Sequence, residues 1–204
     1  CKMLYIFDMG GVVTSTAVVI PKICELLGLS KEKFFEYCGC SDLTGEFHPR
    51  EMNLISMVSN GFIDSPRFWE LFSLHSGISV NTDWWRWLFH PVLNNKTVSI
   101  VKKLKEQGNR VVCGTNTMSC HYSTHLERGD YAYFDQTYSS CAMGVSKPDP
   151  QFWKLILSAE ETEPEASVFI DDRKENCEAA SSLGIKAIQF TTAEELAEKL
   201  NISL

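Results

Sequence analysis

Short apolar runs that end abruptly in polar residues are the feature that most constrains this chain. Residues 3–7 (MLYIF) form the first such run, which stops at Asp8. This pattern predicts a buried strand followed by a tight turn. Further strands are expected at 110–114, 134–138, 168–170 and 186–190, and they alternate with helical patterns at 95–107, 150–159, 175–183 and 194–200. Alternating strands and helices predict an α/β fold, a Rossmann-like parallel sheet with crossover helices.

A long helical stretch separates the first two strands. It runs from residue 18 to about residue 90, too long for an ordinary connection between a strand and a helix. Gly28 is typical of a helix end and Ser30 of a helix start, and helical segments are also predicted from Pro49 and from Ser65. We therefore expect an α/β core formed by residues 1–13 and 93–204, with an inserted α-helical cap at residues 14–92.

Composition narrows the range of partners. Hydrophobic residues make up 44% of the chain and charged residues 22%, so a sizeable core can be buried. The formal net charge is −7 and there is no basic tract, which argues against a nucleic-acid partner. No apolar run approaches the roughly 20 residues that span a bilayer. The predicted core begins at once, which leaves no room for a signal peptide. We expect a cytoplasmic protein without a membrane partner.

The cysteines indicate neither a zinc ribbon nor a thioredoxin motif, because no CxxC pair occurs among them. Free thiols in a reducing compartment are the expectation. The eight are Cys1, Cys24, Cys38, Cys40, Cys113, Cys120, Cys141 and Cys177.

Chemistry-bearing residues follow the predicted strands. Asp8 follows the first, Thr115 and Asn116 end the second, and Asp171 and Asp172 end the fourth. Ligands bind beyond the carboxyl ends of parallel strands. Carboxylates gathered there repel one another, which a divalent cation relieves, and oxygen ligands suit Mg²⁺. With Lys147 nearby, such a site could receive a phosphate for in-line attack by a carboxylate.

Four segments carry a family resemblance. They are FDMGGVV at residues 7–13, GTNT at 114–117, SKPDP at 146–150 and FIDDRKEN at 169–176. In this order they resemble the four motifs of the haloacid dehalogenase (HAD) superfamily, and the helical insertion occurs where the commonest cap of that family is found. The resemblance implies a Mg²⁺-dependent phosphatase that acts on a small phosphorylated metabolite.

By this resemblance, Asp8 is the nucleophile that becomes an aspartyl phosphate. The Asp8 carboxylate, the Gly10 carbonyl and Asp171 are expected to hold Mg²⁺, with Asp172 close by or acting through water. The resemblance thus places four residues around one metal ion.

The same resemblance predicts a phosphate site. Thr115 and Lys147 join Asp8 as catalytic residues, and Lys147 is expected to pair with both the phosphate and Asp8. Gly10, Gly11, Thr115, Asn116 and Lys147 form the predicted phosphate-binding set.

Gly10 departs from the family pattern. Family phosphatases usually carry a second aspartate at this position, which protonates the leaving group; this chain has glycine. General acid catalysis is worth about 10²–10⁴-fold, so substrates with good leaving groups are favoured. A branch resembling glucose-1-phosphate phosphatases also has glycine here, which points to a sugar phosphate.

Two alternatives remain open. A 2-haloacid dehalogenase also lacks the second aspartate, but it needs no metal and does not keep an acidic pair such as Asp171 and Asp172. The other alternative is a non-catalytic regulator that binds phosphate without turnover.

Several other residues have two readings. His121 either faces the site or is a structural histidine, and Arg86 meets either an anionic substrate or a surface carboxylate. The aromatic residues of segment 84–89 (WWRWLF) cannot all face one side of a helix, so some are expected to face a cleft or another helix. Phe47 and His48 are candidate specificity residues at a turn of the cap.

Overall fold

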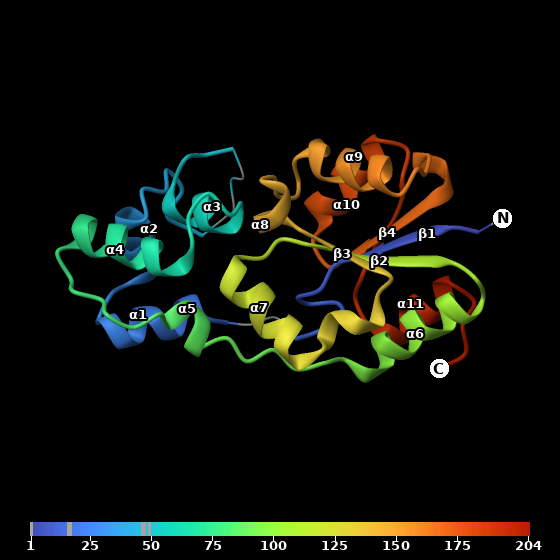
Figure 1. Ribbon diagram of the computed structural model, residues 1–204, viewed down its shortest axis with the longest axis horizontal. Helices are drawn as coiled ribbons and strands as arrows, with labels where there is room; N and C mark the ends of the chain where they lie inside the picture. The colour runs from blue at the N-terminus through green and yellow to red at the C-terminus, as the bar shows by residue number, and fades with distance from the viewer. Residues whose placement is uncertain (1, 16–17, 46–47, 49) are drawn as a thin grey trace.

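A five-stranded parallel sheet forms the centre of the larger lobe in the computed structural model, which describes residues 2–15, 18–45, 48 and 50–204 (Figure 1). Its strand order is β3-β2-β1-β4-β5. The strands are β1 (Leu4–Phe7), β2 (Arg110–Thr115), β3 (Gln136–Ser139), β4 (Ser167–Asp171) and β5 (Lys186–Gln189). In the register, Leu4 is opposite Arg110 on one side and Ser167 on the other. The predicted parallel sheet is confirmed.

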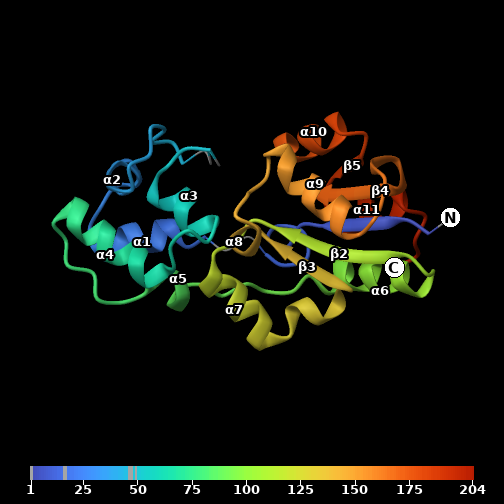
Figure 2. The same ribbon diagram turned by 45° about the horizontal axis from the view of Figure 1, so that its top comes forward.

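Helices cover both faces of the sheet, as Figures 1 and 2 show. On one face lie α6 (Asn95–Glu106) and α11 (Ala193–Lys199), and on the other lie α9 (Pro150–Ala159) and α10 (Lys174–Ser182). Each face has its own apolar core, with Ile100 fully buried in one and Trp153 in the other. The predicted crossover helices are therefore present, with their ends displaced by a residue or so.

Among the described residues, five helices lie between β1 and α6 and form the other lobe, at the left of Figure 1. They are α1 (Ile20–Leu27), α2 (Lys31–Tyr37), α3 (Leu54–Ser59), α4 (Ser65–Ser76) and α5 (Trp84–Trp87). As predicted, Gly28 ends α1 in the left-handed conformation and the Ser30 side chain caps α2.

The helix predicted from Pro49 begins later, at Leu54, so that boundary was wrong. The Asn53 side chain accepts a hydrogen bond from the Ser56 N–H at 2.9 Å and makes Asn53 the N-cap. Pro49 itself lies outside the described residues, as do Cys1 and Phe47.

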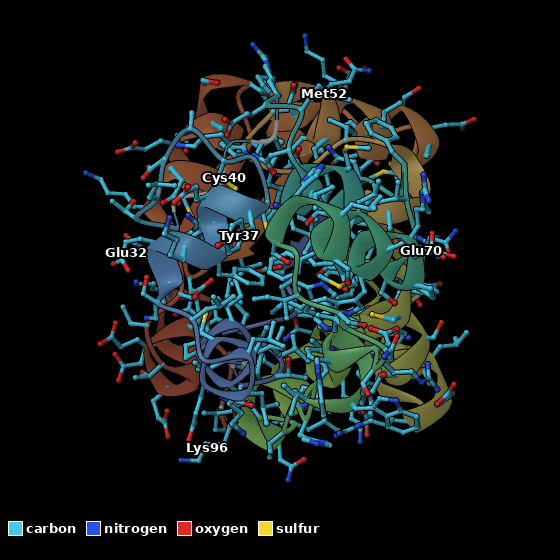
Figure 3. All side chains as sticks on the ribbon, turned by 90° about the vertical axis from the view of Figure 1, so that its left-hand side faces the viewer. Glu32, Tyr37, Cys40, Met52, Glu70 and Lys96 are labelled. Atoms are coloured by element: carbon cyan, nitrogen blue, oxygen red, sulfur yellow. The ribbon has the colours of Figure 1, made fainter. Side chains whose placement is uncertain are left out.

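The helical lobe has its own aromatic core. Phe34, Phe68 and Trp85 are buried together, with ring centroids 5.3 Å apart for Phe68 and Trp85. Seen from the end of this lobe, Glu32 and Glu70 lie on opposite sides of the molecule (Figure 3). Most of this core comes from residues 14–92, with Met118 and Cys120 joining it from the larger lobe. We propose a division into cap and core at residues 14–92.

Two helices of the larger lobe were not predicted from the sequence. Helix α7 (Ser119–Arg128) follows β2, packs against α5, and is continued by a short 3-10 helix η1 (Asp130–Tyr133). Met118 at its N-cap position provides no side-chain cap, and much of its sequence is polar. Its start therefore lacks the usual signal. The other is the short helix α8 (Ser140–Met143), and the remaining short element is 3-10 helix η2 (Pro164–Ala166).

Two expectations concern the chain as a whole. Among the described residues, no helix is both long enough and apolar enough to cross a membrane. The seven cysteines in the described part of the chain are all free thiols.

Candidate active site

Three carboxyl groups meet at the carboxyl edge of the sheet. Asp8 directly follows β1, Asp171 is the last residue of β4, and Asp172 comes next. One carboxylate oxygen from each lies within 4.8 Å of the other two. Asp8 and Asp171 are buried, and the Asp8 N–H donates to the Ile170 carbonyl at 2.9 Å. Adjacent parallel strands thus bring together residues that are far apart in sequence.

Lys147 lies among these carboxylates with a side chain that is almost fully buried. Its Nζ donates to Asp8 Oδ1 at 2.8 Å, to Asp171 Oδ2 at 2.8 Å and to the Gly114 carbonyl at 2.9 Å. All three ammonium hydrogens therefore have acceptors within the protein.

Asn116 holds the segment that carries Lys147. Its Nδ2 donates to the Lys147 carbonyl at 2.9 Å, and its Oδ1 accepts from the Lys147 N–H at 2.8 Å. This two-bond contact joins the end of β2 to the Ser-Lys-Pro segment. The predicted phosphate-binding residue therefore also has a positioning role, which its sequence motif alone did not indicate.

Burial and charge together set the protonation of the cluster. Burial raises the pKa of Asp8 to about 7, with Lys147 opposing and Asp171 reinforcing the rise. Burial also raises the pKa of Asp172, and the Asp171 carboxylate adds to that effect. For Lys147, burial alone would lower the pKa, but Asp171 and Asp8 outweigh it and raise the pKa above its usual value. The lysine stays charged.

The donor set suits a hard divalent cation. Three carboxylates share a single ammonium group, so added positive charge would relieve their repulsion. Their oxygen atoms are the ligands that Mg²⁺ prefers. Asp171 is held in place by the Arg173 N–H at 2.8 Å and by Asn176 Nδ2 at 3.0 Å.

Two predicted phosphate residues lie apart from the cleft that opens over this cluster. Gly11 has φ +82°, and its N–H donates to the Thr14 carbonyl at 2.8 Å, so its amide closes a turn. It lines a separate cavity beside Val92. Thr115 is buried, with its hydroxyl 3.5 Å from the Asn116 carbonyl. Gly10, in contrast, lines the cleft.

The cleft has a volume of about 490 Å³. Asp8, Gly10, Asn116, Lys147 and Asp172 contribute to its lining, so most of the predicted site is gathered in one place. Figure 1 shows the carboxyl ends of the strands facing the helical lobe, and the cleft lies at this junction.

Sequence reasoning missed a group of residues in the cleft. The consecutive residues 18–21 line it, together with Arg173 and Asn176. Residues 18–21 read as ordinary helix-core residues, and no local signal distinguished them. Arg173 and Asn176 belong to the Asp-Asp-Arg-Lys-Glu-Asn motif, so a sequence signal for them was present.

The structure shows the surroundings of the residues for which the sequence allowed two roles. His121 lines the cleft and also bonds the Trp85 carbonyl through Nε2 at 2.8 Å, so both readings of it hold. Arg86 pairs with Glu127 at 3.1 Å, as the surface alternative predicted. Trp85 is buried and lines the cleft, whereas Trp87 is 62% exposed. His48 lies near Asp149 at a different cavity.

A doubly covered parallel sheet with a carboxylate–lysine cluster at its carboxyl edge and a cleft above it defines an α/β enzyme of the hydrolase type. A family model for haloacid dehalogenase-like hydrolases matches residues 2–184. The chain belongs to this family.

Similar proteins extend the comparison. Flavin mononucleotide hydrolase 1 of Arabidopsis thaliana is 37% identical over 70 residues, which cover 34% of this chain and 29% of that protein. A GMP/IMP nucleotidase of Escherichia coli is 29% identical over 96 residues, 47% of this chain and 43% of the other. The match thus spans less than half the length of either relative.

A solved structure shares the fold. A HAD family enzyme from Bacteroides thetaiotaomicron, in complex with magnesium and inorganic phosphate, superimposes with a TM-score of 0.72 at 21% identity. The superposition covers 94% of this chain and 95% of that one.

Proposed function

We propose that this protein is a Mg²⁺-dependent phosphatase that hydrolyses a small phosphate ester through a phosphorylated Asp8. The observation that carries the proposal is the contact of Lys147 Nζ with both Asp8 and Asp171, with Asp172 beside them at the floor of the cleft. The names of the flavin mononucleotide hydrolase and the nucleotidase support phosphate-ester chemistry.

Asp8 is the proposed nucleophile that attacks phosphorus. An Asp8 carboxylate oxygen forms the new P–O bond while the bond from phosphorus to the leaving oxygen breaks. Lys147 holds the Asp8 carboxylate at 2.8 Å and places positive charge where two anions approach each other. Water then hydrolyses the aspartyl phosphate, releasing phosphate and restoring Asp8.

The metal would be held by Asp8, Asp171, Asp172 and the Gly10 carbonyl. When bound, Mg²⁺ would supply charge neutralisation for the phosphoryl oxygens. Lys147 and the backbone near Asn116 are the proposed phosphate ligands. Gly11 and Thr115 are not among them, because the Gly11 amide is already bonded and Thr115 is buried apart from the cleft.

The acidic pair favours this function over haloacid dehalogenation. Attack at carbon needs no cation, whereas Asp171 and Asp172 add charge beside the nucleophile that a cation would offset. Halide release from 2-haloacids in the presence of a chelator would instead support the dehalogenase.

The first test concerns the nucleophile. In Asp8→Asn, release of phosphate from a panel of acyl, aryl and sugar phosphates should fall by about 10⁴-fold. Asp64→Asn is the matched control, because Asp64 caps α4 and asparagine caps helices equally well. Wild-type rates in Asp8→Asn would rule out the aspartyl phosphate. In the wild-type chain, release of one equivalent of leaving group per chain without further turnover would indicate the regulator.

The second test concerns the metal. Asp171→Asn should weaken Mg²⁺ binding severely in a calorimetric titration, because it removes a buried negative charge from the proposed ligand set. Circular dichroism would establish that the variant is folded. Unchanged Mg²⁺ affinity in a folded variant would place the ion elsewhere.

A further inference from the structure

The described residues of the cleft wall nearest α1 are all apolar. Val18, Val19, Ile20 and Pro21 all line the cleft, and none of them carries a hydrogen-bonding side chain. They include the first turn of α1 and the two residues before it. Hydroxyl groups of a ligand that touches residues 18–21 find no side-chain partner on these four residues.

A second wall, formed by α5, by Phe89 just after it and by α7, is aromatic. Phe89 and His121 lie face to face, with ring centroids 3.8 Å apart and planes at 8°. Trp85 meets His121 edge-on at 6.2 Å. The two stacked rings and the indole present a rigid surface that suits a flat apolar group.

His121 adds no charge to this wall. Burial lowers the pKa of His121 to about 4, so the ring is neutral near pH 7. Its Nε2 lies 2.8 Å from the Trp85 carbonyl, which can only accept, so this nitrogen carries the proton. The ring is therefore held in place and belongs to the aromatic wall.

Charged groups are confined to the opposite side of the cleft. Asp8, Lys147, Asp172 and Arg173 come from strand ends and core loops, and Asn116 bonds the Lys147 backbone. Among the described lining residues, the α1, α5 and α7 walls contribute no charged side chain. The cleft thus has a polar end that suits phosphate and an apolar end that suits what the phosphate is attached to.

We propose that the substrate is the phosphate monoester of an apolar aromatic group rather than of a sugar. This inference rests on the proposed phosphatase function. Sugar hydroxyls would lose water against the apolar wall at residues 18–21 without gaining side-chain partners there, which is unfavourable, whereas a flat ring gains contact area on both walls. A phenolate also leaves more readily without protonation than an alkoxide does, and Gly10 has no side chain to supply a proton.

The test compares substrates with leaving groups of similar acidity. With Mg²⁺ present, kcat/KM for 1-naphthyl phosphate should exceed kcat/KM for phenyl phosphate by about tenfold or more, because the second ring contacts the walls. Glucose 1-phosphate should be hydrolysed less efficiently than either.

A matched pair of variants locates the effect. Val18 lines the cleft and is 61% exposed, whereas Val92 is 66% exposed and lines a separate cavity. Val18→Asn should bring the naphthyl-to-phenyl ratio toward one. Val92→Asn should leave both the ratio and acetyl phosphate turnover unchanged.

The outcomes separate the two proposals. If phosphate esters are hydrolysed but glucose 1-phosphate is preferred, or the naphthyl-to-phenyl ratio is near one, the aromatic substrate class is wrong and the phosphatase stands. If no phosphate compound is hydrolysed, the phosphatase is wrong. In that case, calorimetry on the wild-type chain measures which ligand the cleft prefers. The expected result is that 1-naphthyl phosphate binds about tenfold more tightly than inorganic phosphate. Equal affinity for the two would overturn the inference.

Discussion

The ammonium group of Lys147 donates hydrogen bonds to three oxygen acceptors, which belong to Asp8, Asp171 and the Gly114 carbonyl. A buried charge is tolerated only when its partners compensate for lost hydration, and removing one partner of such a pair costs about 3–5 kcal/mol. The same contacts that stabilise the lysine also orient the Asp8 carboxylate. Structure and proposed catalysis therefore depend on one set of bonds.

Gly10 leads to a prediction at the level of a single residue. A Cβ built at Gly10 has no atom within 4 Å, and Gly10 is not among the glycines with positive φ. Gly10→Asp should therefore fold and provide the missing acid. Hydrolysis of alkyl phosphates should rise by about 10²-fold relative to aryl phosphates, measured as a ratio of kcat/KM values.

Gly10→Asn is the control for this change, because it has nearly the same size but no acidic proton. An equal rise in both variants would attribute the gain to a contact other than proton donation. No rise in Gly10→Asp would contradict the leaving-group argument.

At the level of elements, the end of α3 is fastened to the core. The Ser140 hydroxyl donates to the Ser59 carbonyl at 2.6 Å, and the Ser146 hydroxyl donates to Asn60 Oδ1. Ser146 directly precedes Lys147 in the sequence. The helical lobe therefore touches the segment that carries the buried lysine.

Gly61 is the closest point of this contact. A Cβ there would lie 2.0 Å from the Cys141 carbonyl oxygen, and Gly61 also has φ +72°. Gly77 has the same φ but no atom within 4 Å of its Cβ position. In urea denaturation, the free energy of unfolding of Gly77→Ala should be about 1–3 kcal/mol lower than that of wild type, because alanine strains the backbone there. The free energy of unfolding of Gly61→Ala should fall by clearly more, because backbone atoms must also move.

If the free energy of unfolding falls equally in the two alanine variants, the contact between α3 and α8 rearranges without destabilising the protein. In that case the helical lobe would be only loosely joined to the core at this point.

For the whole molecule, the buried cluster predicts how stability depends on pH. The pKa of Asp8 is about 7 in the folded chain against an ordinary value of 3.8. Between these values the folded state binds more protons than the unfolded state, so this contribution to stability falls as pH rises. It is fully present below pH 3.8 and is lost as pH passes about 7.

Asp8→Asn removes this dependence. In chelator, the free energy of unfolding of wild type should decline relative to Asp8→Asn between about pH 4 and about pH 7. Adding Mg²⁺ at pH 8 should then stabilise wild type more than the variant, because only wild type has the full ligand set. Parallel pH curves from chemical denaturation would contradict the assigned burial of Asp8.

We also propose that the helical lobe closes over the cleft as a lid. Residues 18–21 and Trp85 line one side of the cleft, and the strand ends form the other. An ion pair between Arg50 and Asp149, at 3.0 Å, joins the two lobes at the surface. Closure of such a lid would exclude water from the bound phosphate.

The sequence alone determined the sheet and the residues at its carboxyl edge. Strand periodicity and the ordered motifs were sufficient to predict that Asp8, Asn116 and Asp171 would converge, because parallel strands end at the same edge. The start of α2 was predicted correctly at its cap Ser30. The start of α3 was predicted too early, at Pro49, although Asn53 caps it, and α7 was not predicted because Met118 provides no cap.

Only the tertiary structure decided what surrounds those residues. The apolar wall at residues 18–21 and the aromatic wall at Phe89 and His121 come from segments far apart in the chain. The turn that takes up the Gly11 amide and the burial of Lys147 likewise depend on neighbours that no local pattern identifies. Local sequence sets backbone preference and which face is apolar, whereas side-chain environment is a property of contacts between segments, and those exist only once the chain has folded.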